Sequence, residues 1–94
     1  RPKPGVRYSL DVTARITGIS RRSIMVYCRA GLVEPLVRPP YGIIEFTDEA
    51  IYTLRRVDYL RTVHRLELSW IKTLFDLRAE VERLRAEVRF LRSL

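Results

Sequence analysis

The arginines of this 94-residue sequence are the residues whose number and spacing suggest binding chemistry. Lysine and arginine together number 18 against 11 acidic residues, which gives a net charge of +7 at neutral pH. Residues 1–46 contain eight of these bases and three of the acids, so the positive charge is concentrated in the first half. A guanidinium presents a planar fork of donors that fits a phosphate, and clustered positive charge attracts polyanions. The pattern favours a partner such as nucleic acid, although adaptation to heat also enriches arginine.

Residue types that carry catalysis or bind metals are few and scattered. Cys28 is the single cysteine, which excludes an internal disulfide and a cysteine-based metal cage. His64 is the single histidine and lies among arginines, where we expect a surface or packing role. No Ser/His/Asp arrangement and no glycine-rich phosphate loop is present in the sequence. The sequence therefore predicts a protein that is not an enzyme and that has no metal site and no cofactor.

Two short helices in the first half of the chain are expected to position most of the arginines. Residues 10–17 follow Ser9, a favourable N-cap, and end at Gly18, where a helix C-terminus favours a residue with positive φ. A second helix is expected over residues 21–30, with Ser20 as its N-cap. Two short helices joined by a three-residue turn form a helix-turn-helix, whose second helix can enter a groove of DNA.

A β-hairpin is expected over residues 32–46, where short apolar runs flank a Pro-Pro-Tyr-Gly turn. After a helix-turn-helix, such a hairpin is a wing. Thr47 is expected to cap a third helix that runs to about residue 65, because the acidic residues that follow it favour a helix N-terminus. Its inward-facing residues are predicted from their spacing as Ile51, Leu54, either Val57 or Asp58, and Leu60.

The last helix, which Ser69 is expected to cap, carries the most regular apolar pattern of the sequence. Its apolar residues recur at alternating steps of four and three, which is the heptad spacing of a coiled coil. The predicted dimerisation residues are Leu74, Leu77, Val81, Leu84, Val88 and Leu91. Burial of this seam against a second copy would drive association, and packing of the same stripe against the chain's own helices is the alternative.

The residues at the edges of the seam bear on the direction of the two helices. In a parallel pair, Glu80 would meet Arg85 of the second copy, and Glu87 would meet Arg92. An antiparallel pair would place like charges together. β-Branched residues and leucine in alternation also favour a parallel pair of two helices.

The sequence divides into three expected segments. Residues 1–7 are interpreted as a flexible basic arm because they hold two prolines and a glycine among three bases. Residues 8–66 form the winged helix-turn-helix, and residues 67–94 form the dimerisation helix. No run approaches 18 apolar residues and no basic-then-apolar signal segment opens the sequence. We therefore expect a cytoplasmic protein with no membrane partner.

Several motifs in the first half occur at a recognisable spacing. They are Tyr8-Ser9-Leu10, Ala14-Arg15-Ile16-Thr17-Gly18-Ile19-Ser20, Tyr27-Cys28-Arg29-Ala30-Gly31-Leu32-Val33-Glu34-Pro35 and Phe46-Thr47-Asp48-Glu49. With these motifs, the sequence resembles the DNA-binding domain of MerR-type transcription regulators. Its tail, at residues 60–71 and 84–91, resembles two small relatives within that group. One is the heat-shock repressor branch, and the other is the CbpM-like chaperone modulators.

The resemblance implies a mainly α, MerR-like winged helix-turn-helix with a small β-hairpin wing and a C-terminal coiled-coil dimerisation helix. It implies a homodimer that binds duplex DNA as a transcription regulator, without a separate effector domain after the last helix. It also implies an antiparallel pairing of the last helices, opposite to the direction that the charged residues favour. The DNA-binding residues that it implies are Arg15, Arg21, Arg22, Ser23, Tyr27, Arg29, Arg38 and Tyr41.

The alternative function is that of a CbpM-like modulator that binds the J-domain of a DnaJ-type co-chaperone. The sequence has Met25 and Glu45 where the MerR pattern has cations, which is a change expected in that branch. A J-domain presents a basic face, however, which the positive first half of this chain would repel. DNA is therefore the favoured partner.

Overall fold

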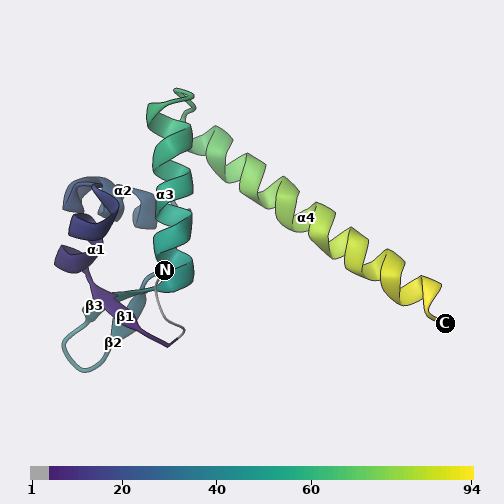
Figure 1. Ribbon diagram of the computed structural model, residues 1–94, viewed down its shortest axis with the longest axis horizontal. Coiled ribbons are helices and arrows are strands. Elements are labelled where there is room, and N and C mark those ends of the chain that lie inside the picture. Colours follow the sequence, from purple (N-terminus) through teal and green to yellow (C-terminus); the bar gives the residue numbers. More distant parts are fainter. Residues whose placement is uncertain (1–4) are drawn as a thin grey trace.

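The computed structural model describes residues 5–94, which form helices and a small antiparallel sheet (Figure 1). The strands are β1 (Arg7–Ser9), β2 (Leu36–Arg38) and β3 (Ile43–Thr47), and their order in the sheet is β1-β3-β2. The helices are α1 (Leu10–Thr17), α2 (Arg21–Arg29), α3 (Asp48–Thr62) and α4 (Leu68–Arg92). This arrangement confirms the predicted mainly helical, winged helix-turn-helix fold with a long C-terminal helix.

The first three helices begin where hydroxyl side chains predicted them to begin. Each of these side-chain oxygens accepts a hydrogen bond, 3.1–3.2 Å long, from the backbone N–H three residues later. The three caps are Ser9, Ser20 and Thr47. Gly18 ends α1 at φ 72°, and its N–H donates to the carbonyl of Ala14 at 2.9 Å. These local hydrogen bonds satisfy helix termini, so they fix the ends of the elements independently of the rest of the fold.

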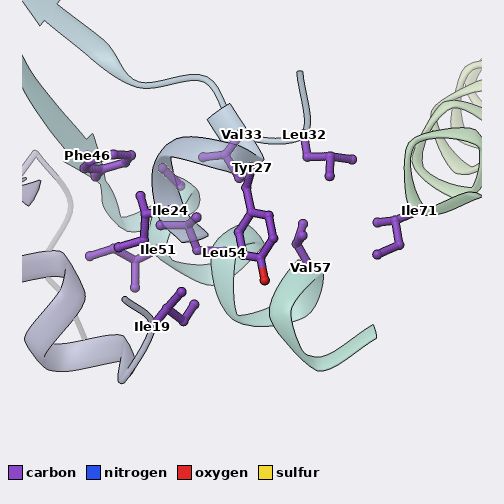
Figure 2. Close-up of a cluster of buried hydrophobic side chains, with 11 residues drawn as sticks. Ile19, Ile24, Tyr27, Leu32, Val33, Phe46, Ile51, Leu54, Val57 and Ile71 are labelled. Atoms are coloured by element: carbon purple, nitrogen blue, oxygen red, sulfur yellow. The ribbon is translucent and has the colours of Figure 1, made fainter. Parts of the chain in front are cut away.

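The hydrophobic core lies between α2, α3 and β3 (Figure 2). Its largest fully buried side chains are Tyr27, Phe46, Ile24, Leu54, Ile71 and Val57. The predicted inward face of α3 is confirmed at Ile51, Leu54 and Val57, and Leu60 packs partly buried against the same cluster. Ile71 reaches this core from the first turn of α4, and it is the fully buried residue that fastens α4 to the domain.

Strand β1 was not predicted from the sequence. Residues 5–7 were assigned to a flexible arm, but Arg7 lies in this strand and pairs with Thr47 of β3. The strand forms because β3 offers a second edge to the chain that leads into α1, and Tyr8 packs there against the core. So short a strand has no alternating pattern to reveal it. The remainder of the expected arm, residues 1–4, lies outside the described residues.

The connection between α3 and α4 differs from the prediction at both of its ends. Helix α3 stops at Thr62 rather than near residue 65, and Arg65 turns the chain with φ 58°. Helix α4 begins at Leu68 after Glu67, so Ser69 lies inside the helix and does not cap it. The change of direction sends α4 away from the domain, and its C-terminal end lies far from every other element (Figure 1).

Candidate nucleic-acid interface

Helix α2 presents arginines on the side opposite to its buried residues. Ile24 and Tyr27 are at most 1% exposed and face α3. Arg22 and Arg29 are seven residues apart, which is close to two helical turns, so they share the opposite, solvent-facing side. Arg15, in the last turn of α1, is also exposed. The amphipathic pattern that buries one face of α2 thus leaves a row of guanidinium groups on the other face.

Tyr27, which the resemblance implies as a DNA-binding residue, is buried in the structure. Its side chain is 1% exposed, and its hydroxyl donates a 2.6 Å hydrogen bond to Oδ1 of Asp58 on α3. The guanidinium of Arg61 lies 5.6 Å from the centre of its ring. Burial raises the pKa of Tyr27 above its ordinary value, and the hydrogen bond to Asp58 raises it further. Tyr27 therefore fixes α2 on α3 and supports the interface from behind.

Arg21 and Ser23 lie at the first turn of α2 and already have partners. Nη1 of Arg21 donates to Oδ1 of Asp11 on α1 at 2.7 Å, and both side chains remain about two-thirds exposed. The Ser23 hydroxyl accepts a 3.1 Å hydrogen bond from the hydroxyl of Ser20. The sequence did not single out Asp11, because only the fold brings the first turns of α1 and α2 together.

The wing combines one cation with an apolar surface. Arg38 in β2 approaches Glu45 of β3, with 3.8 Å between the nitrogen and the oxygen. Tyr41 lies at the tip of the hairpin and is 85% exposed. Val37 and Ile43 are also exposed, on the two strands beside it. The wing can therefore offer an aromatic ring and aliphatic side chains to a partner, with the opposite charges of Arg38 and Glu45 close to each other.

Arg55 of α3 was missed by sequence reasoning and lies against the helix-turn-helix. Its Nη2 donates a 2.8 Å hydrogen bond to the carbonyl of Ile16 at the end of α1, and the side chain stays exposed. A cation near the last carbonyls of a helix interacts favourably with the helix dipole. Arg55 thus holds the end of α1 in place and adds positive charge beside the last turn of α1, which carries Arg15. Its distance of 39 residues from Ile16 in sequence hides this pairing.

The remaining candidate groups are those that could bind a metal ion or act as a nucleophile. Within residues 5–94, no group of three His, Cys, Asp or Glu side chains is placed to hold a metal ion. Cys28 is half-buried, and this burial raises the pKa of its thiol more than neighbouring Arg29 lowers it. A raised pKa keeps the thiol protonated at neutral pH and makes it a poor nucleophile. None of the helices in this part of the chain is long and apolar enough to cross a membrane.

The predicted dimerisation residues form an uncovered apolar stripe along α4. Their side chains are 44–58% exposed, and Trp70 at the start of the stripe is 62% exposed. A hollow runs along this side of the helix and is lined by Val81, Leu84 and Val88 together with Arg85, Arg89 and Arg92. Only the first turns of α4 touch the domain, through Leu68, Ile71 and Phe75. The guanidinium of Arg56 lies 5.8 Å from the centre of the Phe75 ring. The stripe therefore does not fold back on the chain's own helices.

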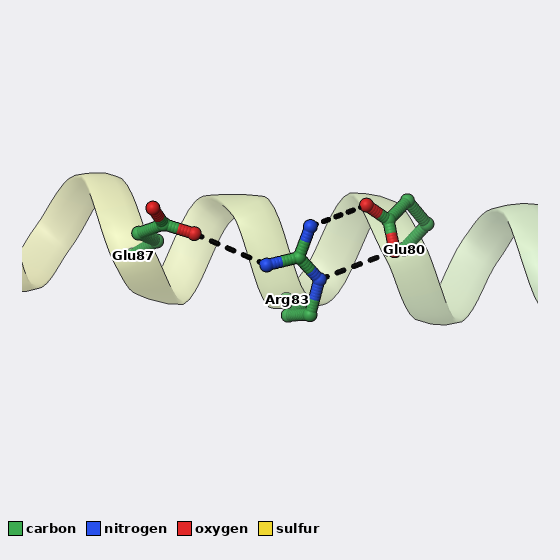
Figure 3. Close-up of polar contacts among 3 residues, drawn as sticks. All are labelled: Glu80, Arg83 and Glu87. Atoms are coloured by element: carbon green, nitrogen blue, oxygen red, sulfur yellow. Dashed lines mark hydrogen bonds and ion pairs between the residues drawn. The ribbon is translucent and has the colours of Figure 1, made fainter.

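The acidic residues beside this stripe are engaged within their own helix (Figure 3). Nε of Arg83 donates a 3.1 Å hydrogen bond to Glu80, and Nη1 of Arg83 donates a 3.1 Å hydrogen bond to Glu87. The hydrogen bond from Arg83 holds the pKa of Glu80 below its ordinary value. Arg85, the expected partner of Glu80 in a second copy, lies 3.6 Å from Glu82 of the same helix. These contacts weaken the argument that charge pairs between copies select a parallel dimer.

A comparison with known protein families places this arrangement in context. The model of the MerR HTH family of regulatory proteins matches residues 8–77, from β1 to the third turn of α4. No curated protein matches the chain. The matched segment contains the helix-turn-helix, the wing, α3 and the residues that anchor α4. Because this match covers most of the sequence and the fold agrees with it, the chain belongs to the MerR helix-turn-helix family of regulatory proteins.

Proposed function

We propose that this protein is a transcription regulator that binds duplex DNA as a homodimer, with α2 in the major groove and α4 pairing the two copies. Residues 8–66 would form the DNA-binding domain and residues 67–94 the dimerisation segment. The observation that carries the proposal is the exposed row of arginines on α2, opposite the face that Ile24 and Tyr27 bury. A second helix of a helix-turn-helix offers this outer face to base edges and phosphates.

The charge of this face predicts how binding depends on salt. Arg15, Arg22 and Arg29 are exposed, and Arg55 is a further exposed cation at the end of α1. Each phosphate that a cation neutralises releases counterions, so the logarithm of affinity falls linearly with the logarithm of salt concentration. If these four cations of each copy reach phosphates, the slope for a dimer is about −7. Their exposed positions also suit rapid encounter with DNA.

The uncovered stripe of α4 supports pairing with a second copy. An apolar stripe that repeats every seven residues matches the same stripe on an identical helix, so one surface serves both partners. The six dimerisation residues are each roughly half-exposed in the single chain and would lose that exposure in a pair. Two domains held together bind adjacent sites on one duplex with higher affinity than either domain alone. Pairing through α4 would thus strengthen the contacts that each α2 makes.

The experiment is a salt titration of binding to a random-sequence duplex, followed by fluorescence anisotropy. Replacing Arg22 and Arg29 together by alanine should weaken binding and reduce the salt slope by about 4 for a dimer. Replacing Arg78 and Arg83 of α4 by alanine removes the same charge away from the helix-turn-helix, at residues that do not line the hollow along the stripe, and serves as the matched control. Equal effects of the two double substitutions, or a wild-type affinity that salt does not change, would contradict the assignment of α2.

The second candidate function is modulation of a DnaJ-type co-chaperone through its J-domain. The wing supports it, because Val37, Tyr41 and Ile43 expose apolar surface while Glu45 offsets Arg38. Such a surface suits a protein partner more than a phosphate. The discriminating measurement is titration of the protein with a purified J-domain and, separately, with duplex DNA. Tight J-domain binding that Tyr41→Ala abolishes, together with no DNA binding, would replace the first proposal.

A further inference from the structure

The ion pair between Asp11 and Arg21 links the two helices of the helix-turn-helix across their first turns. Nη1 of Arg21 and Oδ1 of Asp11 are 2.7 Å apart, and the side chains are 66% and 67% exposed, respectively. Arg22 and Arg29, which share the helix with Arg21, form no ion pair among residues 5–94. Asp11 therefore occupies one particular arginine of α2 and leaves the others open to a partner.

The first turn of α2 is electrostatically unusual for a helix. It contains no acidic residue and carries Arg21 and Arg22 instead. A helix N-terminus bears a partial positive charge, which acidic residues stabilise and which basic residues oppose. Ser20 satisfies one backbone N–H there but adds no negative charge. In the free protein, Asp11 is thus the carboxylate that balances this end of α2.

We propose that Asp11 attenuates sequence-independent DNA binding by competing with phosphate for Arg21. This inference rests on the proposed function of α2 as the DNA-binding helix. A phosphate that approaches the first turn of α2 must either displace the carboxylate from Arg21 or remain close to it. Both cases lower the affinity, the first through the lost ion pair and the second through repulsion of like charges. Weak attachment to arbitrary DNA matters because a genome offers a very large excess of nonspecific sites.

The test variant is Asp11→Asn, which keeps the size of the side chain and removes its charge. Any such variant raises the net charge by one, which alone strengthens binding to DNA. Asp76→Asn is the matched control, because Asp76 also forms an exposed ion pair, 3.2 Å from Lys72 and 65% exposed, but it lies on α4, outside the helix-turn-helix. Thermal unfolding followed by circular dichroism checks that both variants are folded at the assay temperature.

Binding to a random-sequence duplex is then measured by anisotropy across a range of salt concentrations. Asp11→Asn should bind about three- to tenfold more tightly than wild type at low salt, because one exposed ion pair is released in each copy of a dimer. Its salt slope should become steeper by about 2, since Arg21 of each copy gains a phosphate contact. Asp76→Asn should change neither quantity by more than the small effect of its charge.

A second substitution, Arg21→Ala, shows whether Asp11 acts through this arginine. We expect Arg21→Ala to weaken binding only slightly in the wild type, where Asp11 already competes for Arg21. In the Asp11→Asn background it should weaken binding several-fold and remove the added salt slope. This difference between backgrounds is the coupling that a double-mutant cycle measures.

The outcomes separate this inference from the proposed function. If the wild type binds DNA with a strong salt dependence but Asp11→Asn behaves like Asp76→Asn, the role of Asp11 is refuted and the function of α2 stands. Weaker binding by Asp11→Asn would likewise overturn the inference, because it would show that the carboxylate contributes a favourable contact. If the wild type and Asp11→Asn both fail to bind DNA at low salt, both the proposed function and this inference are refuted.

Discussion

Substitution of two residues in the middle of the α4 stripe should separate the dimer into single chains. Leu84 and Val88 are 47% and 46% exposed in the single chain, and both line the hollow on this side of the helix. Full burial of such a side chain contributes about 1.5–3 kcal/mol, so burial of the exposed half contributes about 1 kcal/mol. Replacing both by lysine removes four such contributions from a dimer, or about 4 kcal/mol. This loss corresponds to about a thousandfold weaker association.

The lysines also add repulsion, because four ammonium groups would have to lie within one apolar seam. The matched control is Ala79→Lys with Ala86→Lys, which introduces the same charges on the opposite side of α4, where both alanines are exposed. Sedimentation equilibrium over a range of concentrations measures the mass of each protein. We expect a dimer for the wild type and the control, and a monomer for Leu84→Lys with Val88→Lys.

A wild-type protein that remains monomeric at concentrations of tens of micromolar would refute this reasoning, as would a seam variant with an unchanged mass. The monomeric variant should also bind DNA more weakly than the control, because it loses the benefit of two linked domains. Equal DNA affinity of the two variants would show that a single domain carries the whole interaction.

Further predictions concern the core behind the interface. Thr13 is fully buried, and its hydroxyl has no hydrogen-bond partner in the structure. Thr13→Val should therefore raise the free energy of unfolding, measured in urea, by about 1 kcal/mol. A lower free energy of unfolding would show that the hydroxyl does have a hydrogen-bond partner. Tyr27→Phe should lower the same free energy by about 1–2 kcal/mol, since Asp58 loses its donor, and an unchanged value would refute a structural role for this bond. Because the pKa of Tyr27 is raised on folding, the contribution of its hydroxyl to the free energy of unfolding is complete below pH 10. This contribution is lost as pH rises through the folded-state pKa. Stability should therefore fall above pH 10, and Tyr27→Phe should make the fall shallower. Cys28 should react with iodoacetamide at pH 8 much more slowly in the folded protein than in urea, and equal rates would contradict the raised pKa of its thiol.

The starts of α1, α2 and α3 and the end of α1 could be predicted from the sequence because they depend on local interactions. Ser9, Ser20 and Thr47 cap helices through hydrogen bonds that span three residues, and Gly18 supplies a backbone conformation that other residues adopt less readily. A break between α3 and α4 was predicted, but it was placed too late at both ends, and the cap of α4 was assigned wrongly to Ser69. No side chain caps α4, so the sequence held no residue-specific signal for its first turn.

Several residues of the candidate interface could not be placed without the fold. The spacing of Ile24 and Tyr27 places both residues on one side of α2. Only the contacts of Tyr27 with Asp58 and Arg61 of α3 show that this tyrosine lies beneath the candidate interface. The pairing of Asp11 with Arg21 also depends on the angle between α1 and α2. Such contacts join residues that are distant in sequence, and no local pattern encodes them.

By itself, the sequence determined the positive charge of the first half, the capped helices and the heptad stripe, because residue type and periodicity carry these properties directly. The tertiary structure decided which arginines of α2 are open, which one Asp11 holds, and that α4 leaves the domain with its stripe uncovered. An amphipathic helix has the same pattern whether it packs on its own domain or projects from it. The turn at Arg65 and the anchoring by Ile71 set the direction of α4, and these are properties of the folded chain.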